Sequence, residues 1–325
     1  MAESASDQLQ NGQQDASGAF RRIVVPLDGS HVAERALPYA EELARLLNAS
    51  LHLVRVTDPL RPDSPLANLL ALDAMSLDVW LEGERVAARE YLDQLQTDLR
   101  QRQMTVTVEH LDGSTVNALL SSTRPGDLLV MATHGRGGPA RWFLGSTAEA
   151  VVRRATVPVF LVRADDDAAP QPDFRRIVVP IDGSARAEEA LPIAQELASR
   201  LAIPVHLITV IDVPGTVALD IAVAAISAER LEETMVEVLT EAERDIAHAC
   251  QRLGDAGIAI TTDVLHGDPD LVIPAATQPG DLIVMTTHGR SGPARWFLGS
   301  VAEAVVRRST VPVLLLRAAE ASPAS

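Results

Sequence analysis

The fold is decided by residues 128–149, which read LLVMATHGRGGPARWFLGSTAE. The first four form an apolar run typical of a buried strand, and a glycine-rich loop with Arg136 and Arg141 follows. Gly145 and Ser146 then open a helix. Because free amide groups at a helix start attract anions, this order of strand, basic loop and helix predicts a site for a phosphate-like group.

Two interpretations of the helix start compete. Ser146 and Glu149 have the spacing of a capping box, which by itself indicates only a capped helix. The glycines favour more than a cap, because Gly135 and Gly138 before the loop and Gly145 after it let the backbone approach a ligand closely. With two arginines in the same loop, an anion site is the better interpretation.

The stretch occurs twice. Residues 282–303 read LIVMTTHGRSGPARWFLGSVAE, and FRRIVVPLDGS at 20–30 returns as FRRIVVPIDGS at 174–184, so matching positions lie 154 residues apart. Such a repeat indicates an internal duplication and two similar domains. The predicted division is a disordered arm at 1–19, a first domain at 20–163, an acidic linker at 164–173, a second domain at 174–317 and a disordered tail at 318–325.

Composition excludes several classes of function. The 325 residues carry a net charge of -16, but half of that excess lies in the arm, the linker and the tail, and no basic stripe beyond the two loops suggests nucleic-acid binding. All 28 basic residues are arginine, which excludes a lysine Schiff base and the lysine of a P-loop. Cys250 is the single cysteine. With no signal peptide and no apolar run of membrane-spanning length, we expect a cytoplasmic protein with no membrane partner.

The chain alternates between strand and helix patterns, which predicts an α/β fold with a mainly parallel sheet covered on both faces. In the first copy we expect strands at 21–27, 51–57, 105–111, 128–133 and 157–163, a helix from 32 to 47, a longer helix near 83–103, and a helix from 146 to about 154. Residues 60–82 and 213–226 are ambiguous: each could be a short helix or lid, or could pack against a partner. The apolar closing strands, 157–162 and 311–316, would be sticky if uncovered, so we expect them to meet each other or another subunit.

At these residues the chain resembles the universal stress protein family in tandem form, over 20–163 and 174–317. The resemblance rests on the opening strand ending in Pro-x-Asp-Gly-Ser, the glycine loop, and the Val-Pro-Val closing strand. It implies two doubly wound domains, each with five parallel strands in the order 3-2-1-4-5. Members that bind ATP carry Gly-x-x-Gly, nine residues, then Gly-Ser or Gly-Thr. Gly135 with Gly145, and Gly289 with Gly299, match this spacing, whereas the first glycine is Ala132 in one copy and Thr286 in the other.

The resemblance implies a nucleotide site in each domain, with ATP as ligand. The site residues expected in the first domain are Pro26, Leu27, Asp28, Val56, Gly113, Met131, Ala132, His134, Gly135, Arg136, Gly138, Arg141, Gly145, Ser146 and Thr147. Those expected in the second are Pro180, Ile181, Asp182, Val210, Gly267, Met285, Thr286, His288, Gly289, Arg290, Gly292, Arg295, Gly299, Ser300 and Val301.

Within these sites, Asp28 and Asp182 should lie against adenine or ribose, and Val56 and Val210 against the base. The amides of the loops and of the helix starts should lie against the phosphates. His134 and His288 could contact ribose or phosphate, or fix their own loops. The turn Asp28-Gly29-Ser30 could equally be a helix cap. No metal-binding constellation stands out, so any Mg²⁺ would arrive with the nucleotide.

Three functions fit these observations. The leading one is an ATP-binding stress-response protein that acts as a nucleotide-dependent signalling module, without catalytic residues. A slow ATPase would use loop arginines Arg141 and Arg295 to stabilise phosphates, and a nucleotide-free scaffold would exist for its closing strands, as Ala132 and Thr286 suggest. The expected partners are an adenine nucleotide and the other domain of the same chain, with a homodimer as a further option.

Overall fold

The computed structural model describes residues 20–58, 74–134, 144–164, 172–211, 228–254, 257–287 and 299–317, with the backbone alone at 74–77, 134 and 228–234. The two glycine loops and most of the ambiguous segments at 60–82 and 213–226 therefore lie outside the described residues. So do the predicted arm, most of the linker, and the tail.

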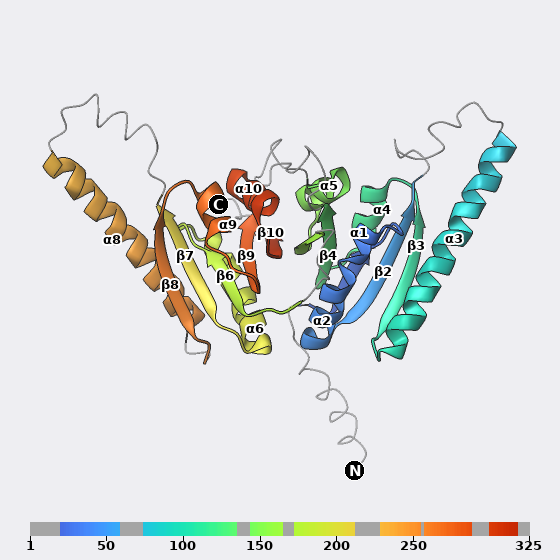
Figure 1. Ribbon diagram of the computed structural model, residues 1–325, viewed down its shortest axis with the longest axis horizontal. Helices are drawn as coiled ribbons and strands as arrows, with labels where there is room; N and C mark the ends of the chain where they lie inside the picture. The colour runs from blue at the N-terminus through green and yellow to red at the C-terminus, as the bar shows by residue number, and fades with distance from the viewer. Residues whose placement is uncertain are drawn as a thin grey trace, which may run out of the picture.

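Ten strands form one continuous sheet in the order β3-β2-β1-β4-β5-β10-β9-β6-β7-β8 (Figure 1). The first half contains β1 (Arg22–Pro26), β2 (Ser50–Thr57), β3 (Val106–Asp112), β4 (Asp127–His134) and β5 (Val159–Ala164). The second half contains β6 (Arg176–Pro180), β7 (Val205–Ile211), β8 (Ile260–His266), β9 (Asp281–Thr287) and β10 (Val313–Arg317). Within each half the strands are parallel and follow the order 3-2-1-4-5, so the predicted fold class is confirmed.

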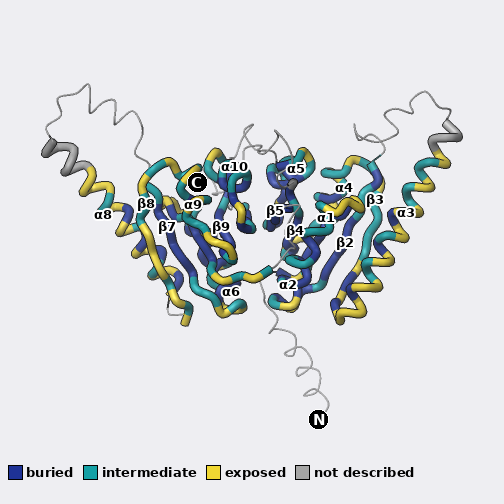
Figure 2. Tube along the Cα trace, viewed as in Figure 1, coloured by how far each residue is buried: buried dark blue, intermediate teal, exposed yellow. Residues whose placement is uncertain are grey.

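Helices cover both faces of the sheet. The first half has α1 (His31–Glu34), α2 (Leu37–Leu47), α3 (Ala74–Gln101), α4 (Thr115–Ser122) and α5 (Ser146–Arg154). The second has the 3-10 turn η2 (Ala187–Ala190), α6 (Leu191–Leu201), α8 (Ala228–Leu253), α9 (Pro269–Ala275) and α10 (Ser300–Arg308). Helices α2, α3, α6 and α8 enclose one apolar core, and α4, α5, α9 and α10 enclose the other (Figure 2).

Two predicted helices have different boundaries in the structure. The single helix expected at 32–47 is divided, because α1 ends at Glu34 and α2 begins at Leu37 with Pro38 in its first turn. Proline lacks an amide hydrogen and is best tolerated in a first turn, so the helix restarts there. Residues 74–82, predicted as part of a short helix or lid, instead extend α3, which lies at one end of the molecule while α8 lies at the other (Figure 1).

The closing strands pair with each other. Strands β5 and β10 are antiparallel, with Phe160 opposite Leu314, so the prediction that these strands would meet is confirmed within one chain. Two reciprocal hydrogen bonds cross this junction: Arg163 donates to the carbonyl of Ser309 at 3.2 Å, and Arg317 donates to that of Ala155 at 3.0 Å. The two domains therefore share one sheet.

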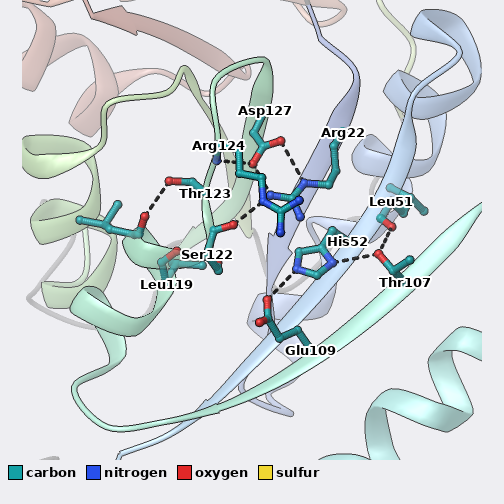
Figure 3. Close-up of polar contacts among 11 residues, drawn as sticks. Arg22, Leu51, His52, Thr107, Glu109, Leu119, Ser122, Thr123, Arg124 and Asp127 are labelled. Atoms are coloured by element: carbon teal, nitrogen blue, oxygen red, sulfur yellow. Dashed lines mark hydrogen bonds and ion pairs between the residues drawn. The ribbon is translucent and has the colours of Figure 1, made fainter.

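A buried ion pair joins β1 to β4 at the amino ends of these strands (Figure 3). The Arg22 guanidinium donates to both carboxylate oxygens of Asp127, at 2.9 and 2.6 Å, and Asp127 is only 3% exposed. In the second half Arg176 pairs with Asp281 in the same way, at 3.0 and 2.5 Å. The pair fixes β1 against β4 in the first half and β6 against β9 in the second.

A buried histidine lies beside each ion pair. The ring of His52 contacts the Thr107 hydroxyl at 2.9 Å and the Glu109 carboxylate at 3.0 Å (Figure 3). Burial lowers the pKa of His52 below its usual value, against the opposing effect of the hydrogen bond that the ring donates to Glu109. His206, the equivalent of His52 in the second half, also has a lowered pKa, and burial is the main cause. Both rings are therefore neutral in the folded chain near neutral pH.

Candidate functional site

A pocket opens at the carboxyl ends of β1, β2 and β4, next to the start of α5. Its volume is about 130 Å³. We call it the first pocket, and it brings together nine of the residues predicted for the first domain: Pro26, Leu27, Asp28, Val56, Met131, Ala132, Gly145, Ser146 and Thr147. At this position the connections that follow β1 and β4 leave toward opposite faces of the sheet, which is the usual ligand site of a doubly wound fold.

The second pocket repeats this arrangement, with a volume of about 220 Å³. It brings together eight residues predicted for the second domain: Pro180, Ile181, Asp182, Val210, Met285, Thr286, Ser300 and Val301. Gly299, which was predicted with them, is the residue that precedes the first turn of α10.

Other predicted residues lie elsewhere or outside the described part. Gly113 and Gly267 are not in the pocket linings; they occupy turns after β3 and β8 with φ of 118° and 129°, and their amides donate to Thr57 and Ile211. His134 ends β4, but its side chain is not described. The loop residues Gly135, Arg136, Gly138 and Arg141, and in the second copy His288, Gly289, Arg290, Gly292 and Arg295, lie outside the described residues.

The turn after β1 fixes Asp28 at the pocket. The Asp28 carboxylate accepts a hydrogen bond from the Ser30 amide at 2.9 Å, and the Ser30 hydroxyl accepts from the Ala33 amide at 3.1 Å. The helix-cap interpretation of this turn is therefore confirmed, since Ser30 caps α1. Asp28 is nevertheless exposed and lines the pocket, so its local role leaves it accessible to a ligand.

The predicted capping box at α5 is wrong. The cap position is Gly145, with φ of 84°, and no side chain caps the helix. Ser146 is the first helical residue, which places Glu149 one position too far along to return to the cap. Glu149 instead accepts a hydrogen bond from Arg153, one turn later, at 2.7 Å. In the second copy Gly299 precedes Ser300 at φ of 91°, and Arg307 donates to Glu303 at 2.5 Å.

The start of α5 therefore presents uncapped amides to the pocket. The first hydrogen bond of this helix runs from the Glu149 amide to the Gly145 carbonyl at 2.9 Å, so the amides of the three residues 146–148 have no intrahelical partner. These residues line the first pocket, and residues 300–302 line the second. By contrast, Ser30 caps α1 and Asp268 caps α9. Uncapped amides with a helix dipole behind them favour an anion.

Sequence reasoning missed several lining residues. In the first pocket these are Ser30, Val32, Ala33, Val54, Thr115, Leu119, Leu144 and Ala148, and in the second they are Ser184, Arg186, Ala187, Ile208, Pro269, Ile273 and Ala302. A signal existed for Val54, because it lies two residues from Val56 and therefore on the same face of its strand. For Thr115 and Leu119 there was none, since only the fold brings α4 to this edge.

The two pockets differ at seven matched lining positions. Three exchange one aliphatic side chain for another, Thr115 and Thr147 become Pro269 and Val301, and the remaining two make the second pocket more polar. Val32 in the first corresponds to Arg186 in the second, and Ala132 corresponds to Thr286. The Thr286 hydroxyl donates to the backbone carbonyl of Arg186 at 3.0 Å. The two substituted residues are therefore in direct contact, although 100 positions separate them in the chain.

The polar groups behind the pockets also differ. In the first half the Tyr91 hydroxyl donates to Glu34 at 2.8 Å, and the Arg55 guanidinium lies 5.1 Å from the centre of the Tyr91 ring. Burial, with that hydrogen bond, raises the pKa of Tyr91. In the second half Glu188 accepts from His248 at 2.8 Å and from Arg252 at 2.5 Å. Burial opposes these two bonds, but they hold the pKa of Glu188 below its usual value.

None of the helices in the described part of the chain is long and apolar enough to cross a membrane.

Comparison with known proteins gives a consistent family. A family model described as "Universal stress protein family" matches residues 19–163 and again 173–317. Universal stress protein Rv2005c of Mycobacterium tuberculosis is 28% identical over 306 residues, covering 91% of this chain and 96% of that protein. Universal stress protein Rv2623 of the same species is 26% identical over 315 residues, with the same coverage. A crystal structure of a universal stress protein from Archaeoglobus fulgidus shares the fold, with a TM-score of 0.64 and 20% identity, covering 91% of this chain and 98% of that one.

Proposed function

The chain belongs to the universal stress protein family, and from this premise we propose that each of its two pockets binds an adenine nucleotide, with ATP as the ligand. One observation carries the proposal: α5 begins without a side-chain cap inside the same pocket that holds Asp28 and Val56. The pocket thus offers a place for an anion, a polar acceptor and an apolar wall together.

The phosphates fit the start of α5. The uncapped amides at 146–148 would donate to phosphate oxygens, and the helix dipole adds to this attraction by about 0.3–2 kcal/mol. Gly145, at φ of 84°, occupies backbone space that a residue with a side chain reaches only with strain. The second copy presents the same features at Gly299 and residues 300–302.

The nucleoside fits the other side of the pocket. Val54 and Val56 provide an apolar wall from β2, suited to the face of a base, and the Asp28 carboxylate can accept hydrogen bonds from ribose hydroxyls. Ligand pockets usually span about 300–1,000 Å³, so a cavity of about 130 Å³ would enclose only part of a nucleotide. We expect the rest to lie toward the glycine loop.

A holding role is favoured over rapid turnover. Asp28 is the only ionisable side chain among the described lining residues of the first pocket, and we assign its carboxylate to the ribose hydroxyls. We therefore propose that nucleotide occupancy is the signal and that any ATP hydrolysis is slow. The scaffold alternative needs uncovered closing strands as an interface, but β5 and β10 are paired with each other inside the chain. A homodimer would have to use another surface.

The test is to purify the full chain under native conditions, denature it, and identify released nucleotide by mass spectrometry. The proposal predicts adenine nucleotide in the wild type and a reduced amount in Gly145→Asp and in Gly299→Asp, because each places a carboxylate where the phosphate would lie. Circular dichroism of both variants checks that they remain folded. Equal nucleotide content in the wild type and in the double variant would contradict the proposed site.

A further inference from the structure

The two pockets are unequal in charge, and we propose that Arg186 makes the second pocket select phosphorylated ligands more strongly than the first. The inference rests on the proposed nucleotide binding and adds a division of labour between the copies. It starts from the replacement of Val32 by Arg186 and of Ala132 by Thr286 in the pocket lining.

The contact between the two substituted residues fixes where Arg186 lies. Because the Thr286 hydroxyl donates to the Arg186 carbonyl at 3.0 Å, the end of β9 is tied to the residue that precedes η2. Ala132 has no hydroxyl with which to donate to the Val32 carbonyl, so the first half cannot form this link. The hydroxyl of Thr286 is also committed to a backbone partner, so the threonine acts as a tether for the Arg186 backbone.

The guanidinium of Arg186 is available to a ligand. No ion pair or side-chain hydrogen bond involves it within the described ranges, and the residue is only partly buried. Two acidic side chains near it are already engaged: Asp182 accepts from the amide and the hydroxyl of Ser184 at 3.0 and 2.6 Å, and Glu188 accepts from His248 and Arg252. A third carboxylate, that of Asp245, lies against Gly183 in the preceding turn.

Phosphate is the chemical group that suits this position. Arg186 lines the same pocket as the uncapped start of α10 at Ser300, so an anion there could be held from two sides. A guanidinium presents its donors in a fork that matches phosphate oxygens, whereas Val32 offers the first pocket an apolar surface. Each phosphate on the ligand should therefore contribute more to the free energy of binding in the second pocket than in the first.

Calorimetric titration of the full chain with adenosine, AMP, ADP and ATP, at fixed Mg²⁺, tests this selectivity. Gly145→Asp disables the first pocket and reports on the second, and Gly299→Asp does the reverse. Since a hydrogen bond to a charged group contributes more than a neutral one, we expect the preference for ATP over adenosine to be about tenfold greater in the second pocket.

Reciprocal exchange identifies the residues responsible. In the Gly145→Asp background, Arg186→Val should remove about tenfold of the preference for ATP over adenosine, because it weakens ATP binding more than adenosine binding. In the Gly299→Asp background, Val32→Arg combined with Ala132→Thr should confer that preference on the first pocket. Arg175→Ala is the control, because it also removes one positive charge, from an exposed residue whose partner is Asp173.

The outcomes separate this inference from the proposed function. If both pockets bind ATP but Arg186→Val weakens adenosine and ATP equally, or changes neither, the inference is wrong and nucleotide binding stands. If Arg175→Ala has the same effect as Arg186→Val, overall charge accounts for the preference, and the inference is again wrong. If neither pocket binds any of the four ligands, the proposed function itself fails.

Discussion

The two halves of this chain have the same contacts at the amino ends of their strands and different residues at the carboxyl ends. At the amino ends of the strands, Arg22 with Asp127 and Arg176 with Asp281 repeat the same two-point ion pair. At the carboxyl ends, Arg186 stands where the first half has Val32. The comparison indicates that both halves keep the contacts that join their central strands, while the pockets differ in charge.

The divergence extends behind the pockets. In the first half Arg55 and Tyr91 lie next to the turn after β1. In the second half Asp245 lies next to the matching turn after β6. The backbone turn itself is conserved between the copies, since Gly29 and Gly183 have φ of 82° and 75°. The same main-chain geometry is thus surrounded by opposite charges, which gives the comparison several points at which it can be tested.

The largest expected effect concerns the repeated ion pairs. Asp127→Ala and Asp281→Ala should each lower the free energy of unfolding by about 3–5 kcal/mol, because each leaves a mostly buried guanidinium without its partner. Urea denaturation followed by circular dichroism measures both. Asp173→Ala, which breaks the exposed pair with Arg175, should cost less than about 1 kcal/mol. A large difference between the two buried pairs would break the claimed equivalence of the halves.

A smaller effect, unequal between the halves, is expected at the turn after the first strand of each half, that is, after β1 and after β6. Gly29→Ala and Gly183→Ala should each cost about 1–2 kcal/mol, because both glycines have left-handed φ. Gly183→Ala should cost more, since its Cβ would overlap the Asp245 carboxylate, whereas at Gly29 the nearest atom is 3.2 Å away at the flexible end of Arg55.

Thermal unfolding compares these two glycine variants directly. Adding Asp245→Ala to Gly183→Ala should remove the extra cost and make the two turns equal. If the two single variants are equally destabilised from the start, the carboxylate does not crowd this turn.

The smallest effect concerns acid sensitivity. Burial lowers the pKa of His52 and His206, so the unfolded chain binds more protons and stability should fall as the pH drops below the usual histidine value of about 6.5. Each ring has the arginine of its ion pair close by, but His52 has a hydrogen-bonded carboxylate at 3.0 Å, whereas the Asp263 carboxylate lies 3.4 Å from His206. His206→Gln should therefore remove more of the acid sensitivity than His52→Gln.

Unfolding measured at several pH values above pH 5, before most carboxylates titrate, checks this difference. The opposite order, or stability that rises on acidification, would contradict the assigned electrostatics of the two histidines.

The sequence predicted the elements of the fold better than their details. Alternation and periodicity located most strands and helices within a few residues, and the apolar closing strands predicted the junction between Val159 and Leu315. The strand order came from the family resemblance, since periodicity does not identify neighbours. The capping box failed because Gly145 takes a backbone conformation that moves the cap by one residue.

The candidate site was predicted only in part, because sequence locates the ends of strands but not the contacts between distant elements. Residues at or just beyond the carboxyl ends of strands, such as Asp28 after β1 and Ala132 near the end of β4, could be placed on one edge by topology alone. Arg186 could not, because its contact with Thr286 depends on how the turn before α6 packs against β9, and 100 residues separate the two in sequence.

The most direct test of the account is isothermal titration calorimetry of the nucleotide-free wild-type chain with Mg-ATP. The account predicts two bound nucleotides per chain, and one each for Gly145→Asp and Gly299→Asp. Absence of binding heat at millimolar ATP, in a chain that also releases no nucleotide on denaturation, would contradict it.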